Sequence, residues 1–209
     1  MHASLAGPSV IADPSADLSH VDGRRLRSED SRRRIVAAML ELVEAGVLAP
    51  SADQVAAKAG VGLRSVFRHF TDMDSLYLEI GEIIAPRLLA AGRLPFTGTT
   101  WQEQVAEFVH RRAVAFEALA QILRAVHLHS HRSVAVRAGR VQVSNALRTL
   151  LQSRVPDGAL SATAFEALDM ALSFEVWARL RDEQGLSVAA AKGVLSGLVD
   201  CILKTSNAA

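Results

Sequence analysis

Two arginines spaced four residues apart, Arg64 and Arg68, are the side chains in this sequence best placed to act on a partner. They lie in the segment SADQVAAKAGVGLRSVFRHF, residues 51–70, which predicts a helix, a tight turn at Ala59-Gly60-Val61 and a second helix. Residues four apart share one face of a helix, so both guanidinium groups could meet the same surface. Arginine reads guanine with two hydrogen bonds and binds phosphate equally well. The segment therefore predicts a helix-turn-helix whose second helix enters the major groove of DNA.

The positive charge of the chain is concentrated around this segment. The whole chain has a formal charge of only +1, yet residues 24–70 contain nine basic and five acidic residues. Residues 1–23 hold three aspartates and no Lys or Arg, and residues 71–209 hold fourteen residues of each sign. This local excess favours an anionic partner, with nucleic acid as the leading candidate. Three arginines open the basic stretch and would form either an arm along DNA or a solvated tail: Arg24, Arg25 and Arg27.

Groups that could hold a metal ion or catalyse a reaction are incomplete. Glu107 and His110 form one Glu-x-x-His, but a di-iron site in a helical bundle needs two. His127, His129 and His131 are interpreted as a solvated helix end, because no cysteine or carboxylate cluster completes a metal site. Neither a glycine-rich phosphate loop nor a serine elbow occurs. We therefore expect no enzyme activity, no metal and no cofactor.

Helical periodicity dominates the chain, and no segment alternates with the period of a strand. Residues 1–27 are the exception, and we expect a disordered tail that ends in the basic arm. No run without Asp, Glu, Lys or Arg is longer than residues 1–12, so neither a membrane span nor a secretion signal is expected. The fold class is predicted to be all-α, with a three-helix DNA-binding unit over residues 28–72 and a helical bundle for ligand binding and dimerisation over residues 73–205. Helices are expected from 31 to a stop at Gly46, over 51–59 and 62–69, from a cap at Asp72 to a loop at 93–100, and over 101–126, 134–155, 161–183 and 187–204.

The N-terminal part resembles a known bacterial family, the TetR-type transcriptional regulators. Residues 31–38, SRRRIVAA, are similar to the opening helix of that family, and Gly46-Val47 is similar to its usual Gly-aromatic ending. Ser51, Val55-Ala56, Ala59-Gly60-Val61 and His69-Phe70 stand where the family has its second helix, its turn and the end of its recognition helix, and Asp74-Ser75-Leu76 looks like the start of its fourth helix. The resemblance covers residues 31–78. It predicts that DNA is contacted by Arg32, Ser51, Leu63, Arg64, Ser65, Phe67, Arg68 and His69.

Four positions depart from the family pattern, and each departure removes an expected contact with phosphate. Gly62 stands where Ser or Thr is usual, so the recognition helix has no side-chain cap. Phe67 replaces a tyrosine and lacks its hydroxyl. Met73 and Asp53 stand where the family usually or often has a basic residue.

Beyond residue 78, only the number and length of the helices agree with the family. Its members bind a small effector among these helices, and the two DNA-binding heads then move apart. Arg112 takes an apolar slot on the inward face of its helix, so it either snorkels to the surface or needs an acidic ligand or a neighbour such as Glu175. The other candidates could equally fill a core. The predicted ligand-binding residues are Phe108, Arg112, Phe116, Leu119, Leu123, His127, Leu147, Phe174 and Trp177.

The last two predicted helices, 161–183 and 187–204, have wide apolar faces. Paired with a second copy they would form a four-helix bundle, and a two-fold dimer would present two heads to a palindromic double-stranded operator. Cys201 is the single cysteine, so it cannot form an internal disulfide. We expect it to be a small buried hydrophobe of a protein that works in the cytoplasm.

These observations favour a homodimeric DNA-binding transcriptional regulator, expected to be a repressor released by a small-molecule effector. The alternative is a helical ligand- or metal-binding protein that resembles a regulator only at its N-terminus. Salt-sensitive binding to DNA would separate the two.

Overall fold

The computed structural model describes residues 15–206, with side chains from 25 to 205, and over this range the protein is all-α, as predicted. None of the helices in the described range combines the length and apolar character needed to cross a membrane. Ten α-helices and one π-helical turn follow one another: α1 Ser15–Glu44, α2 Ala52–Ala59, α3 Leu63–His69, α4 Met73–Arg93, α5 Trp101–Ala118, α6 Ala120–Ser130, α7 Val134–Gln152, α8 Ala162–Ala171, α9 Phe174–Ala178, η1 Arg179–Glu183 and α10 Val188–Ser206.

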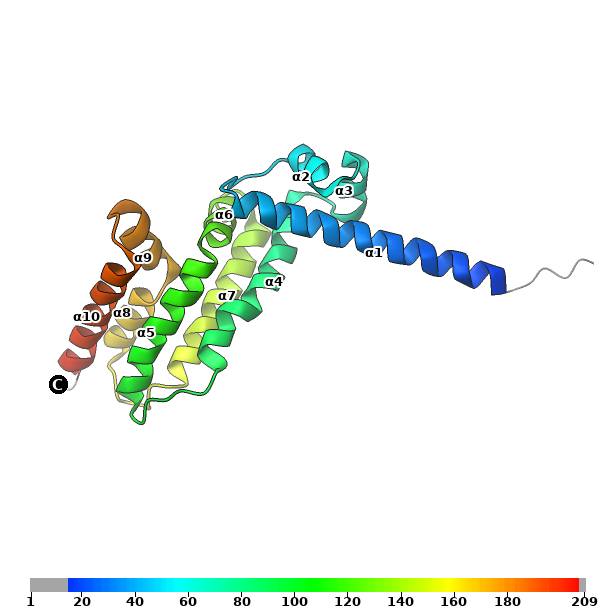
Figure 1. The fold of residues 1–209 in the computed structure, drawn as a ribbon. Coiled ribbons are helices and arrows are strands. Elements are labelled where there is room, and N and C mark those ends of the chain that lie inside the picture. Colours follow the sequence, from blue (N-terminus) through cyan, green and yellow to red (C-terminus); the bar gives the residue numbers. More distant parts are fainter. Residues whose placement is uncertain (1–14, 207–209) are drawn as a thin grey trace, which may run out of the picture.

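Helices α1, α2 and α3 form a small head at one end of the molecule (Figure 1). Its second helix begins at Ser51, whose hydroxyl accepts from the backbone N–H of Gln54 while the Gln54 side chain accepts from the backbone N–H of Ser51. It ends at Gly60, which has φ +63°, the left-handed conformation that glycine adopts without steric cost. Val55 and Val66 are buried beneath these helices, against the long first helix. The predicted helix-turn-helix is therefore present.

Helix α1 is longer than the sequence predicted. It begins at Ser15, so the expected disordered tail is helical from that residue, and residues 1–14 lie outside the described range. No proline interrupts the segment between Pro14 and Pro50, and Arg25 pairs with Glu29 one turn later. The exposed Arg25 and Arg27 thus stand on a helix that projects past the head (Figure 1) rather than on an extended arm.

Helices α4 to α7 form a bundle below the head (Figure 1). Asp72 caps α4 by accepting from the backbone N–H of Ser75, and α4 continues through Pro86. Thr100 caps α5 in the same way through Glu103. The predicted continuous helix 101–126 is broken at Leu119, whose ψ of 9° leaves the helical range, so that α6 starts anew.

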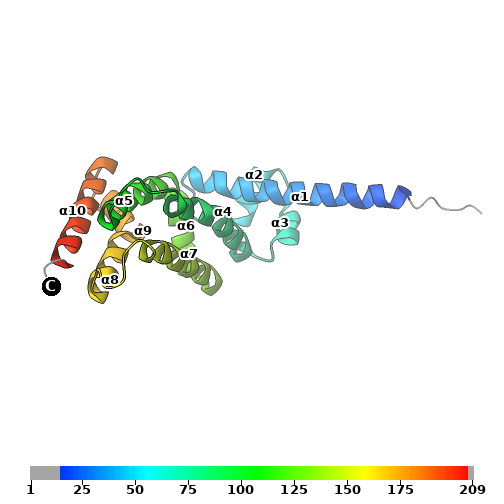
Figure 2. The same ribbon diagram turned by 90° about the horizontal axis from the view of Figure 1, so that it is seen from below.

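Helices α8 to α10 lie at the far end of the bundle from the head (Figure 2). The single helix predicted over 161–183 is wrong: α8 ends at Ala171, and Ser173 caps a short α9 by accepting from the backbone N–H of Val176. The π-helical turn η1 then leads to Gly185, which has φ +63°. Helix α10 packs on α5 and α8.

The recognition helix α3 has no side-chain hydrogen bond at its N-cap, Gly62, which has an ordinary φ of −72° and open space around its Cα. We expect Gly62→Ser to stabilise the protein by a few tenths of a kcal/mol, because a serine hydroxyl can accept from a free N–H of the first turn. The matched control is Gly60→Ala, two residues earlier, which should cost about 1–2 kcal/mol because its left-handed conformation strains an L-residue. Urea unfolding of the three proteins measures both effects, and equal stabilities would contradict this account of the head.

Candidate DNA-binding surface and ligand cavity

The outer face of α3 exposes the two arginines singled out from the sequence. Arg64 and Arg68 are solvent-exposed, and within the described part of the chain neither forms an ion pair. Leu63 and Phe67 are also exposed, with 39% and 48% of their surface accessible. The face therefore combines two free cations with apolar groups, which suits phosphates and the methyl groups of thymine.

Two other predicted contact residues lie at the margins of this face. Ser51 is exposed at the N-terminus of α2, where its hydroxyl is already used as a cap. Ser65 is half-buried. Either can offer a backbone or hydroxyl donor to a phosphate, which fixes register rather than sequence.

The side chain of Arg32 forms hydrogen bonds within the protein. Its guanidinium donates to both carboxylate oxygens of Glu79 on α4 and, at 3.1 Å, to the backbone oxygen of His69 at the end of α3. It also lies over the ring of Phe70, 4.6 Å from the centroid. Its donors thus join α1, α3 and α4, and its contact with DNA stays a prediction.

His69 is half-buried at the inner edge of α3, and its Nε2 is buried without a hydrogen-bond partner. Burial lowers the pKa of His69, and the nearby charges of Arg68 and Arg32 lower it further. The ring therefore stays neutral at physiological pH. A neutral ring turned inward adds no charge to the DNA-facing surface.

A cavity of about 310 Å³ lies inside the bundle. Its walls come mainly from α4 and α7, with contributions from α5, α6, α8, α9 and the segment between α8 and α9. Most of the lining is apolar, including Leu88 and Val143. This volume lies at the lower end of the range for small-molecule sites. Six of the predicted ligand-binding residues line it: Arg112, Phe116, Leu123, His127, Leu147 and Phe174.

Three predicted ligand-binding residues lie elsewhere. Phe108 is fully buried beside Phe96, with ring centroids 5.0 Å apart. Trp177 is fully buried and donates its indole N–H to Glu117. Leu119 lines a separate groove between α4 and α5. These side chains fill core or face another surface, and periodicity alone could not separate them from the cavity wall.

Of the walls supplied by α4 and α7, only Leu147 was predicted from the sequence. Ile84 and Leu88 of α4 face the cavity, and so do Gly139 and Arg140 of α7. The signal was present, because the cavity-lining residues of α7 recur at spacings of three and four, namely Val136, Gly139, Arg140, Val143 and Leu147.

Arg112 is buried in this wall, with only 4% of its surface exposed, so it does not snorkel to solvent. Its Nη1 donates to the backbone oxygen of Leu172 at 2.9 Å, and its Nη2 donates to that of Leu147 at 2.7 Å. Burial lowers the pKa of Arg112 to about 10, and the charge of Asp169 opposes the shift. The guanidinium is still protonated at physiological pH.

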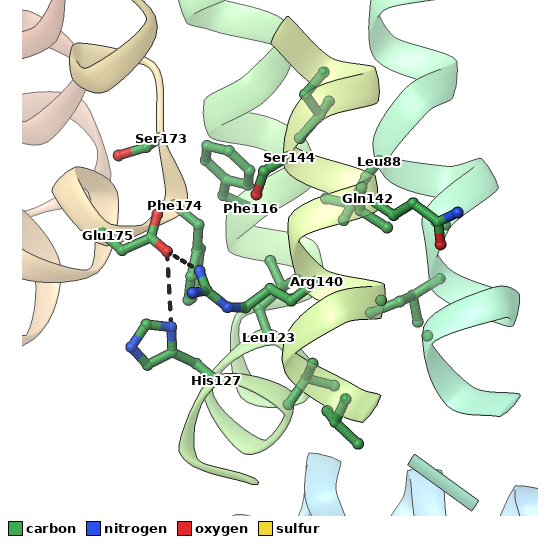
Figure 3. Close-up of a pocket in the computed structure, with 18 of the residues that line it drawn as sticks. Leu88, Phe116, Leu123, His127, Arg140, Gln142, Ser144, Ser173, Phe174 and Glu175 are labelled. Carbon is green, nitrogen blue, oxygen red and sulfur yellow. Dashed lines mark hydrogen bonds and ion pairs between the residues drawn. The ribbon is translucent and has the colours of Figure 1, made fainter. Parts of the chain in front are cut away.

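Glu175 pairs with Arg140 and His127 instead of Arg112. Figure 3 shows this cluster beside the cavity: the Arg140 Nη1 donates to the Glu175 carboxylate at 2.7 Å, and the His127 Nδ1 lies 3.7 Å from the same oxygen. Burial lowers the pKa of His127, the charge of Arg140 lowers it further, and Glu175 partly offsets both. The expectation that Glu175 could neutralise Arg112 is therefore wrong.

Tyr77 joins the cavity to the head. Its side chain lines the cavity, and its hydroxyl donates to the backbone oxygen of Leu48, in the loop between α1 and α2, at 3.3 Å. Its ring stacks on His129 with centroids 3.9 Å apart, and the His129 Nε2 lies 2.6 Å from the Asp74 carboxylate at the start of α4. One side chain thus touches both the cavity and the unit that carries α3.

The three histidines at the C-terminal end of α6 do not converge on one point. The ring of His127 meets that of His131 edge to face at 5.1 Å, while His129 turns toward α4. Within the range that the structure describes, no three His, Cys, Asp or Glu side chains gather closely enough to hold a metal ion.

An exposed helix-turn-helix with free arginines, placed on a helical bundle, is the architecture of a DNA-binding transcriptional regulator. Residues 35–80 match the family model of the bacterial regulatory proteins of the tetR family. The helix-turn-helix segment thus matches the family that the resemblance predicted. No curated protein sequence matches it significantly.

Solved structures share the fold over most of the chain. A transcriptional regulator from Rhodococcus sp. Rha1 is 17% identical, with a TM-score of 0.67 over 83% of this chain and 96% of its own. The TetR-family regulator PfmR from Thermus thermophilus is 22% identical, with a TM-score of 0.56 over 82% and 94% of the two chains. The multidrug binding protein EbrR, solved with imidazole, is 22% identical, with a TM-score of 0.58 over 80% and 88%. At these identities the likeness concerns the fold alone.

Proposed function

We propose that this protein is a homodimeric repressor that binds a palindromic double-stranded operator and releases it when a small molecule fills the cavity. The observation that carries the DNA-binding part is the pair of free arginines, Arg64 and Arg68, on the exposed face of α3. Contacts from Leu63, Phe67 and the N-terminus of α2 would complete each half-site. Cytoplasmic localisation follows from this role.

The outer faces of α8 and α10 support assembly with a second copy. Met170 on α8 and Val194 and Leu198 on α10 have 62%, 47% and 41% of their surface exposed. They lie on neighbouring helices. On α10, Gly193 and Gly197 have open space where a side chain would stand. Cys201 lies on the same exposed helix and is accessible in the single chain, in contrast to its expected burial. An apolar patch on two adjacent helices suits an isologous two-fold contact.

The link through Tyr77 supports release by a ligand. A molecule that displaces Tyr77 would disturb both its hydrogen bond to Leu48 and its stack on His129. The hydrogen bond joins α4 to the head, and the stack joins α4 to α6 within the bundle. A ligand changes a conformational equilibrium only if it binds the two states with different affinity. Contact with Tyr77 would make the affinity of the ligand depend on how the head is held.

Removing the two free arginines should abolish specific DNA binding. We expect Arg64→Ala with Arg68→Ala to weaken binding to the promoter region beside the protein's own gene about tenfold or more, and to lower the slope of log affinity against log salt by roughly 1–2. Gel shifts at several salt concentrations measure both. The matched control, Arg93→Ala with Arg179→Ala, removes the same charge from exposed sites away from α3 and should bind like the parent. If the parent protein gave no salt-sensitive gel shift, the proposal that it regulates transcription by binding DNA would be contradicted.

A charge in the centre of the exposed α10 face should separate the two copies. Leu198→Glu should weaken the dimer by about 2 kcal/mol or more, roughly 30-fold, because the carboxylate would be buried without a partner. Sedimentation velocity measures the change. Val141→Glu places the same charge at a comparably exposed site on α7 and should leave the dimer intact. A monomeric parent protein would contradict this assignment.

Loss of the Tyr77 hydroxyl should loosen the head without loosening the bundle. In Tyr77→Phe the hydrogen bond to Leu48 is lost while the ring remains, at a local cost of about 1 kcal/mol. Amide hydrogen exchange in the loop after α1 should then be about fivefold faster, while exchange in α5 stays unchanged. Uniform acceleration, or none, would show that Tyr77 is not the link.

A further inference from the structure

Among the residues that the structure describes, no carboxylate forms an ion pair with Arg112. Both of its hydrogen-bond acceptors are backbone oxygens, those of Leu172 and Leu147. Its Nε is buried and makes no hydrogen bond. A buried donor without a partner costs free energy, and a buried cation without an anion costs more.

The carboxylates nearest this wall are already paired. Asp169 lines the cavity, but its oxygen lies 3.0 Å from Arg148, which also binds Glu166. Glu175 is paired with Arg140. The Nε of Arg140, on the opposite wall, is likewise buried without a partner. Two guanidinium groups thus line the cavity, each with an N–H donor left over.

The remaining lining limits what can occupy the space. Around Arg112 the walls are made by Phe116, Leu147, Leu172 and Phe174, and Leu88 and Ile84 face them from α4. The rings of Phe116 and Phe174 meet edge to face, with centroids 5.6 Å apart. An occupant gains by burying apolar surface there, which favours a molecule that is mostly hydrocarbon.

We propose that the ligand of this cavity is an apolar molecule with a single carboxylate, which accepts a hydrogen bond from the Arg112 Nε while its hydrocarbon part lies among Phe116, Leu88 and Leu147. The inference rests on the proposed function for the role of the cavity as the effector site, and it adds the chemical class of the effector. The carboxylate neutralises Arg112 without breaking the two bonds to the backbone. A neutral analogue leaves the cation unbalanced, and an amine is repelled by it.

The test uses three probes of one shape: decanoate, decanamide and decylamine. Isothermal titration calorimetry of the full-length protein near neutral pH should show decanoate binding about tenfold or more tightly than decanamide, and no binding of decylamine. A parallel pair, 4-phenylbutyrate and its amide, separates fatty acids from aromatic acids as the source of the carboxylate. Equal affinity for acid and amide in both pairs, or preference for the amine, would overturn the proposal.

Variants locate the preference at Arg112. In Arg112→Met the acid and the amide should bind with similar affinity, because the guanidinium is gone while an apolar chain of similar length remains. Arg112→Lys keeps the charge but not the Nε fork, so decanoate should bind about threefold or more weakly even if Arg112→Met does not fold. The control Arg124→Gln breaks an exposed pair with Asp182 outside the cavity and should not change the preference. An unchanged affinity for decanoate in Arg112→Lys would contradict the site.

Failure of this inference and failure of the proposed function have different signatures. The calorimetry contains no DNA, so carboxylate binding is measured independently of regulation. If decanoate binds through Arg112 but leaves the gel shift intact, the ligand class stands and release of the operator by this ligand fails. If acid and amide release DNA equally, regulation stands and the carboxylate assignment fails.

Discussion

The buried guanidinium of Arg112 is the interaction around which the bundle is arranged. It brings together a carbonyl of α7 and the carbonyl of Leu172, which becomes available because α8 ends one residue earlier. The break at Leu172–Ser173 then starts α9 and directs Phe174 toward the cavity. A buried guanidinium requires nearby acceptors, because each N–H donor without one costs free energy. The bond from Arg112 to Leu172 thus ties α5 to the break between α8 and α9, beside one wall of the cavity.

The head could be predicted closely from the sequence because its signals are local. Ser51 and Asp72 cap helices three residues ahead of the N–H groups they bind, and Gly60 marks a left-handed turn. Such contacts are visible in a short window of residues. The ion pair of Arg32 with Glu79 could not be predicted, because the two residues are 47 positions apart in the sequence. An arginine at position 32 is of the right type to bind DNA, but its guanidinium pairs with Glu79 on α4.

The bundle was predicted in outline, and its breaks were missed. Apolar spacing continues smoothly through Leu119 and Leu172, so periodicity predicts one helix where the structure has two. The predicted cavity residues came mostly from α5, α6 and α9, with only Leu147 from α7, whereas α4 and α7 supply much of the lining. Phe108 and Trp177 have the same residue character as Phe116 and Phe174 but point into packed core. Separating them needs the relative rotation of the helices, which tertiary packing sets.

Tyr77 belongs at once to the wall of the cavity and to the support of the head. Thermodynamic linkage makes any coupling through it reciprocal. A ligand that loosens the head must itself be held less tightly when DNA fixes the head, and by the same factor. The concentration at which this protein responds would therefore depend on how much of it is bound to its operator.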